Sequence, residues 1–181
     1  MAVLRTTVRA IAIAILKTIY RIRATGLENL PDGGALLVAN HLSHVDALVV
    51  GAAIGRREVR FLMHRAIFAV PLIGAFSRWM GAMPVAAEDT PEAKARSLAA
   101  AAEAARSGSL VCIFAEGGIS RSGALLPFAR GLEIIAREAR VPIVPVALDR
   151  LWGSLFSFSE GRFFWKRPQR VPYPVEVSVD E

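Results

Sequence analysis

The stretch LLVANHLSHVDALVVGAAIG, residues 36–55, places a block of polar residues inside an otherwise apolar run. The apolar residues around the block predict a short buried strand over 35–39 and a helix over 47–55. Polar groups between two buried elements are stable only when each one finds a partner. The block therefore has either a structural or a chemical role, and the sequence of the rest of the chain is needed to distinguish the two.

Short apolar strands and helices alternate along the rest of the chain. We expect further strands over 59–63, 110–114, 141–148 and 174–179, and helices over 91–107 and 128–139. This alternation predicts an α/β fold: a single domain with a central, largely parallel mixed sheet flanked by helices. Because ligands of such sheets bind beyond the carboxyl ends of strands, the loops that follow strands 35–39 and 110–114 are the candidate site.

The composition favours an anionic partner at a lipid surface. The chain has 181 residues, a net charge of +6, a pI near 10.4, 54% hydrophobic residues and a mean hydropathy of +0.41. A basic chain suits nucleic acid, a membrane surface or a phosphorylated substrate, and the high apolar content favours the membrane. The single cysteine, Cys112, excludes an internal disulfide and is expected in a buried strand.

The first 23 residues predict a basic amphipathic helix. One apolar stripe at helical spacing faces a basic half of the helix, and the two sets are Leu4, Val8, Ile11, Ile15, Ile19, Ile22 and Arg5, Arg9, Lys17, Arg21, Arg23. The longest uncharged run, 10–16, is too short to span a bilayer. We expect 1–25 to be a membrane-associating helix and 26–181 to be the main α/β domain. A helix packed on its own domain is the alternative.

The first loop, NHLSHVD, offers a histidine and a carboxylate for general-base chemistry. On one continuous helix His41 and Asp46 would point about 140° apart, so they can meet only if a helix begins between them. Ser43 and Asp46 have the S-x-x-D form of a capping box, which would return the Asp46 side chain toward His41. The spacing alone fits a simple helix cap at least as well. A metal site of His41, His44 and Asp46 is not expected, because no further cysteine or histidine completes it.

The second loop, AEGGISRSG at 115–123, suits an anion. Its glycines let backbone N–H groups approach an oxyanion, its hydroxyls add donors, and Arg121 adds a guanidinium group. The loop is neither a Walker loop nor the G-x-S-x-G elbow of serine hydrolases. An ordinary turn, in which Gly and Ser are frequent, is the alternative.

Together, NHLSHVD, the F-A-E-G end of strand 110–114 and VPIVPV resemble the glycerophospholipid acyltransferases, the family of 1-acylglycerol-3-phosphate acyltransferase. The similarity runs from about Gly26 to the C-terminus. The tail LDRLWGSLFSF...GRFFWKRP is most similar to the acyltransferase domain of bifunctional acyl-carrier-protein synthetase/2-acylglycerophosphoethanolamine acyltransferases. The chain departs from the family pattern at Ala115, Gly118, Ile119 and Ala87, and these departures concern the residues that would hold the acceptor phosphate.

The resemblance implies a lysophospholipid acyltransferase. Such an enzyme transfers a fatty acyl group from acyl-CoA or acyl carrier protein to the free hydroxyl of 1-acylglycerol-3-phosphate or a related lysophospholipid, without a metal or other cofactor. His41 would be the general base and Asp46 its orienting partner, and backbone N–H groups near Ser43 would bind the oxyanion. The expected substrate-binding residues are Asn40, Ser43, Glu116, Gly117, Gly118, Ser120, Arg121 and Arg130.

The expected partners follow from this function. They are the membrane surface with its anionic phospholipid, the lysophospholipid acceptor, the acyl-CoA or acyl-carrier-protein donor, and transporter or acyl-ligase domains fused to or associated with the chain; nucleic acid is not expected. The expected location is peripheral or monotopic at the cytoplasmic face of a membrane. Aromatic and basic residues between Trp152 and Tyr173, Trp165 among them, suit a membrane interface or an acyl groove. The rival functions are a serine-dependent lipid hydrolase, with Ser120 as nucleophile, and a non-catalytic membrane-binding module.

Overall fold

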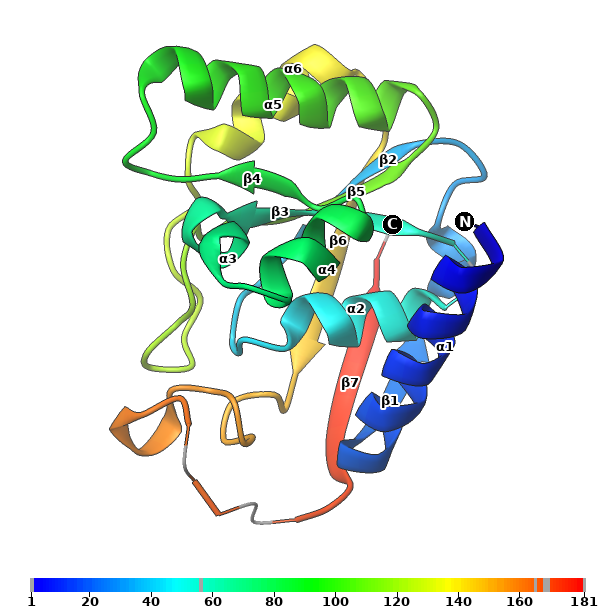
Figure 1. The fold of residues 1–181 in the computed structure, drawn as a ribbon, viewed down its shortest axis with the longest axis vertical. Coiled ribbons are helices and arrows are strands. Elements are labelled where there is room, and N and C mark those ends of the chain that lie inside the picture. Colours follow the sequence, from blue (N-terminus) through cyan, green and yellow to red (C-terminus); the bar gives the residue numbers. More distant parts are fainter. Residues whose placement is uncertain (1, 56, 165, 168–169, 181) are drawn as a thin grey trace.

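Seven strands form one mixed sheet in the computed structural model, which describes residues 2–55, 57–164, 166–167 and 170–180; Trp165 lies outside this part (Figure 1). The sheet has the order β1-β7-β6-β2-β5-β3-β4. All neighbours are parallel except β6 and β7, so β1 and β7 run opposite to the other five strands. The predicted α/β class with a largely parallel mixed sheet is confirmed. The strands are β1 Tyr20–Thr25, β2 Ala35–Ala39, β3 Val59–His64, β4 Met83–Val85, β5 Leu110–Phe114, β6 Ile143–Asp149 and β7 Tyr173–Val179.

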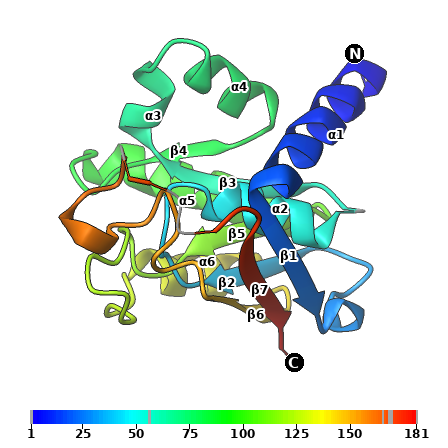
Figure 2. The same ribbon diagram turned by 90° about the horizontal axis from the view of Figure 1, so that it is seen from below.

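Helices lie on both faces of the sheet (Figures 1 and 2). One core joins α1 and α2 to the sheet and the other joins α5 and α6 to it, because successive side chains of a strand point to opposite faces. Leu37 of β2 belongs to the first core and Leu36 to the second. The helices are α1 Ala2–Ile19, α2 Asp46–Ile54, α3 Arg65–Ala69, α4 Ile73–Trp79, α5 Pro91–Arg106 and α6 Gly131–Ala139, with short 3-10 turns at Leu27–Asn29 and Ser159–Gly161.

One half of the sheet has an open face. Along β6 the residues Val144, Val146 and Leu148 are buried, whereas every residue at the alternate positions between 143 and 149 is exposed. The buried set faces the core that contains α1 and α2. The opposite face of β6 is therefore in contact with solvent, although the same face of β2 and β5 packs under α5.

The predicted N-terminal helix is too long at its C-terminal end. Helix α1 ends at Ile19, and residues 20–25, which we expected to be helical, form β1 at the edge of the sheet beside β7. Tyr20 is buried and Ile22 partly buried, whereas Arg21 and Arg23 are exposed. This period of two is the pattern of a strand with one buried face, and it decides the local structure because Tyr20 and Ile22 gain burial in the core.

Helix α1 packs on the domain through a face that includes only part of its predicted apolar stripe, Ile19. Leu16 is buried, and Ile13 and Ile19 pack against the same core, whereas Ile11 and Ile15 of the stripe are 55% and 58% exposed. Within the described residues, no helix combines the length and the apolar character needed to cross a bilayer. The helix therefore leaves two isoleucines facing outward.

Candidate active site

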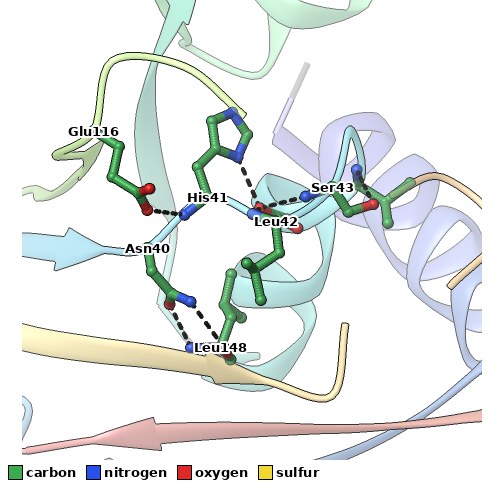
Figure 3. Close-up of polar contacts among 8 residues, drawn as sticks. Asn40, His41, Leu42, Ser43, Glu116 and Leu148 are labelled. Carbon is green, nitrogen blue, oxygen red and sulfur yellow. Dashed lines mark hydrogen bonds and ion pairs between the residues drawn. The ribbon is translucent and has the colours of Figure 1, made fainter. Parts of the chain in front are cut away.

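The site begins where β2 ends, and Asn40 fixes this point (Figure 3). The Asn40 amide nitrogen donates to the carbonyl of Leu148 at 2.9 Å, and the Leu148 N–H donates to the Asn40 side-chain oxygen at 2.7 Å. The side chain thus continues the pairing of β2 with β6 beyond the last residue of the strand. We expected Asn40 to bind substrate, but its contacts are those of a residue that positions the next one, His41.

His41 and Asp46 are brought together at the start of α2. The distance between His41 Nδ1 and Asp46 Oδ2 is 2.7 Å. A carboxylate oxygen only accepts, so this contact assigns the proton of the neutral ring to Nδ1 and leaves a lone pair on Nε2. The His41 side chain is 20% exposed and Asp46 is fully buried. The ring also stacks on Phe114, with centroids 4.2 Å apart. His41 is therefore held on two sides and still reaches solvent.

The predicted capping box forms only in part. Asp46 is the first residue of α2 and Val45 is its N-cap, whereas the S-x-x-D spacing predicted Ser43 as the cap and Asp46 in the third helical position. Asp46 Oδ2 accepts from the backbone N–H groups of Leu42 at 2.6 Å and Ser43 at 3.0 Å. Two of the backbone N–H groups near Ser43 that we expected to bind the oxyanion, those of Leu42 and Ser43, therefore already donate to Asp46.

Glu116 joins the second loop to the first. Its Oε1 accepts from the His41 N–H at 2.7 Å, and its Oε2 accepts from the Leu126 N–H at 2.7 Å. The Ser120 N–H in turn donates to the His41 carbonyl at 2.8 Å. Hydrogen bonds to the N–H and to the carbonyl group of His41 thus connect the loop after β5 to the loop after β2, the two loops that the sequence analysis selected.

Ser120 has a structural position in this loop. Its hydroxyl is buried, donates to the Ala124 carbonyl at 2.7 Å and accepts from the Gly123 N–H at 3.0 Å. Across the described chain, no serine hydroxyl bonds the His41 ring. The hypothesis of a serine hydrolase therefore has no support from these contacts, since a serine nucleophile needs the base within hydrogen-bond reach.

The remaining residues of the second loop differ in their positions. Gly117 has a φ of 67°, which favours glycine, and its N–H donates to the Phe114 carbonyl at 3.1 Å. The N–H groups of Gly118 and Ile119 have no partner among the described residues. Arg121 is exposed, and its guanidinium lies 5.1 Å from the ring centre of Phe158. Arg130, also expected at the site, is exposed at the start of α6 and makes no side-chain contact with the residues above.

An aromatic segment after β6, which contains Phe156, Phe163 and Phe164, lies beside the first loop and packs against His44. The His44 ring contacts Phe163 and Phe164, with ring centres 4.4 and 5.3 Å apart, and the backbone N–H of His44 donates to the Phe156 carbonyl at 3.3 Å. Desolvation lowers the pKa of His44, and the charge of His41 lowers it further. Sequence reasoning assigned no role to His44, because its partners lie more than a hundred residues away.

Lys166 holds the aromatic segment in place. Its ammonium group is buried and donates to the Ser154 and Ser157 carbonyls at 2.8 and 2.6 Å and to the Ser159 hydroxyl at 3.0 Å. Desolvation lowers the pKa of Lys166. The basic residues of this segment were expected to suit a membrane interface or an acyl groove, whereas the hydrogen bonds of Lys166 connect the turns of the segment to one another.

The fold and the site together define a class: an α/β protein in which a histidine, paired with a buried carboxylate, lies at the carboxyl end of a central strand, where ligands of such sheets bind. Among the described residues, no three His, Cys, Asp or Glu side chains lie close enough to hold a metal. The Acyltransferase family model matches residues 21–149. This range contains both site loops and covers most of the chain, so the chain belongs to the acyltransferase family.

Curated relatives carry the names of lipid enzymes. A chloroplastic 1-acyl-sn-glycerol-3-phosphate acyltransferase of Brassica napus is 34% identical over 131 residues, which are 71% of this chain and 37% of the relative. The 1-acyl-sn-glycerol-3-phosphate acyltransferase of Bacillus subtilis is 29% identical over 121 residues, 66% of this chain and 58% of the relative. The chain thus spans between about a third and three fifths of the length of these relatives.

The fold also matches a solved structure. The 1-acyl-sn-glycerophosphate (LPA) acyltransferase PlsC of Thermotoga maritima has a TM-score of 0.74 and 23% identity, over 98% of this chain and 69% of that one. At this identity the match establishes the shared fold. It covers nearly the whole of the chain, the N-terminal region included.

Proposed function

We propose that this chain transfers a fatty acyl group from a thioester donor, acyl-CoA or acyl carrier protein, to the free hydroxyl of 1-acylglycerol-3-phosphate or a related lysophospholipid. The observation that carries the proposal is the contact of 2.7 Å between His41 Nδ1 and the buried Asp46, with the ring open to solvent. Family membership and the names of the relatives support the choice of substrate class.

The reaction needs one base and no covalent intermediate. His41 Nε2 takes the proton of the acceptor hydroxyl while its oxygen forms a bond to the thioester carbonyl carbon. Asp46 stabilises the imidazolium that forms and keeps the ring in this orientation. The tetrahedral intermediate then collapses, its C–S bond breaks, and the departing thiolate receives the proton from His41. Apart from the thioester donor, which is a co-substrate, this mechanism uses no cofactor.

The oxyanion needs donors other than the Ser43 N–H. We assign this role to the N–H groups of Gly118 and Ile119, which have no partner in the described chain and belong to the loop tied to the His41 backbone. Preorganised donors of this kind are typically worth ~10²–10³ in rate. Arg121, exposed at the same loop, supplies the positive charge for the acceptor phosphate.

The amphipathic helix supports a peripheral membrane location. The outward Ile11 and Ile15 of α1, together with the charge of +6, suit the interface of an anionic bilayer, and we place the enzyme at the cytoplasmic face. Fusion to or association with transporter or acyl-ligase domains remains part of this proposal. It rests on the similarity of the tail.

The test is transfer of a labelled acyl chain from acyl-CoA to 1-acylglycerol-3-phosphate in detergent micelles. His41→Ala is expected to lower kcat by ~10²–10⁴, the usual contribution of a general base. The control is His64→Ala, which removes a half-exposed histidine that pairs with Glu88 at 3.3 Å. Wild-type turnover in His41→Ala would refute the mechanism, and release of free fatty acid without an acceptor would favour the hydrolase instead.

A further inference from the structure

A cavity of about 200 Å³ lies on the open half of the sheet and is lined mainly by arginines. The lining residues are Arg21, Arg23, Arg150, Arg170, Pro174, Val175 and Glu176. They come from β1, from the turn after β6, from the segment before β7 and from β7 itself. None of them is a residue of the proposed acyl-transfer site, so the cavity needs an explanation of its own.

The strand register explains how the arginines meet. Arg21 and Arg23 alternate with residues of β1 that point into the core, so both project from the open face, where they lie beside Pro174 and Glu176 of β7. Arg150 directly follows β6 at a φ of 63°, a conformation that non-glycine residues rarely adopt, and its N–H donates to Asp149 Oδ1 at 2.7 Å. The fold thus gathers side chains distant in sequence at one place.

The charges around the cavity are not balanced. Arg150 Nε lies 3.5 Å from Glu176 and 3.9 Å from Asp149. In the described part of the chain, Arg21, Arg23 and Arg170 form no ion pair. The lining contains four arginines and one glutamate, so its net charge is +3. If Asp149, which lies next to Arg150, is counted as well, the net charge is +2. Like charges that line one cavity repel one another, and a bound anion would reduce this repulsion.

We propose that this cavity binds a phosphate group at a site separate from the acyl-transfer site. Guanidinium groups pair with phosphate through two parallel hydrogen bonds, which favours phosphate over a monovalent halide. The volume suits a phosphate or a small head group, since pockets for whole drug-sized ligands are usually ~300–1,000 Å³. The phosphate belongs either to the head group of an anionic lipid or to a soluble molecule.

The experiment compares two double variants of the full chain that lose the same charge. Arg21→Gln/Arg23→Gln removes two arginines of the cavity. Arg106→Gln/Arg137→Gln removes two exposed arginines that pair with glutamates on α5 and α6. Binding is measured with inorganic phosphate, by chemical-shift titration, and with phosphatidylcholine vesicles with and without phosphatidic acid, by sedimentation. Circular dichroism verifies that both variants fold, and Arg170→Gln, which lies outside the strands, provides a second test.

We expect the cavity variant to weaken binding of at least one probe fivefold or more, and the control variant to stay within twofold of the wild type. Loss only with phosphatidic acid vesicles assigns the site to a lipid head group, and loss with inorganic phosphate assigns it to a phosphate that can be soluble. Equal weakening in both variants would mean a general effect of net charge and would overturn the proposal, as would no weakening in either. Because acyl transfer is not the readout, these outcomes are independent of the proposed function.

Discussion

Asp46→Asn is the sharpest test of how the site is held. In the wild type, Oδ2 of this buried carboxylate accepts from His41 Nδ1 and from the N–H groups of Leu42 and Ser43, at 2.7, 2.6 and 3.0 Å. The introduced asparagine would have to keep its oxygen at the Oδ2 position, because its NH₂ group cannot accept from three donors. The NH₂ group would then stand where Oδ1 is buried without a partner.

Two magnitudes follow from this geometry. Loss of the charge that stabilises the His41 imidazolium should lower kcat by ~10²–10⁴, equivalent to about 3–5 kcal/mol in the barrier. The buried NH₂ group without an acceptor should lower the free energy of unfolding by about 1–3 kcal/mol. KM should change little, because Asp46 is fully buried and does not touch the substrate.

The assay is initial-rate acyl transfer in micelles at saturating donor, combined with urea unfolding of the same samples. Asp32→Asn is the control, since this exposed aspartate lies in the turn before β2. A folded Asp46→Asn protein that retains a third or more of the wild-type kcat would refute the role of Asp46. Equal losses in the Asp32→Asn control would show that the effect is not local.

Three further predictions concern groups around the site. Asn40→Ala removes both hydrogen bonds to the Leu148 backbone, so the free energy of unfolding should fall by about 1–3 kcal/mol; a loss below about 0.5 kcal/mol in urea unfolding would contradict the role of Asn40 as a link between strands. Burial raises the pKa of the Cys112 thiol, so at pH 8 it stays protonated and the native protein should resist iodoacetamide that labels the unfolded chain; rapid native labelling would disprove this. The Tyr20 and Ser154 hydroxyls are buried, and neither forms a hydrogen bond of good geometry within the described residues; burial raises the pKa of Tyr20 to about 12, against a smaller lowering by the neighbouring Ser154 hydroxyl. Tyr20→Phe should therefore leave stability unchanged or raise it by up to about 1 kcal/mol, whereas Tyr173→Phe, which loses a bond of 3.2 Å to a main-chain carbonyl, should lower it; a large loss in Tyr20→Phe would reveal a partner for its hydroxyl.

Local signals predicted most of the fold. The helix after Thr90 begins as expected, with the Thr90 hydroxyl accepting from the Ala93 N–H at 3.3 Å and Pro91 in the first turn. Strand β1 was not predicted, because the apolar residues at 20–25 fit both the helical period of 3.6 residues and the strand period of two. Its pairing with β7, which lies about 150 residues further along the chain, decides between them, and no local pattern contains that information.

The site was predictable where its partners are close in sequence. His41 and Asp46 are five positions apart; the S-x-x-D spacing allowed them to meet but fitted a simple helix cap equally well, and the resemblance to the acyltransferases favoured the pair that the structure shows, although the cap differs. Asn40 bonds a residue 108 positions away, and the Phe163 and Phe164 rings reach His44 from still further. Partners this distant in sequence give Asn40 a positioning role that only the folded chain reveals, while its role in substrate binding stays a prediction.

The Asp46 carboxylate contributes both to stability and to the proposed chemistry. Asp46→Asn and His41→Ala should therefore be equally inactive but differ in stability. Asp46 Oδ2 binds the amides that lead into α2 as well as the His41 ring, so Asp46→Asn should weaken all three bonds by removing the negative charge, and it also buries an NH₂ group without an acceptor. His41→Ala removes only the ring; the Glu116 bond to the His41 N–H and the Ser120 bond to its carbonyl involve the backbone and survive the substitution. His41→Ala should therefore unfold at higher urea than Asp46→Asn while transferring acyl groups no faster. If the two variants were equally unstable, the loop would depend on the His41 ring as much as on the charge of Asp46, and the reasoning would be refuted.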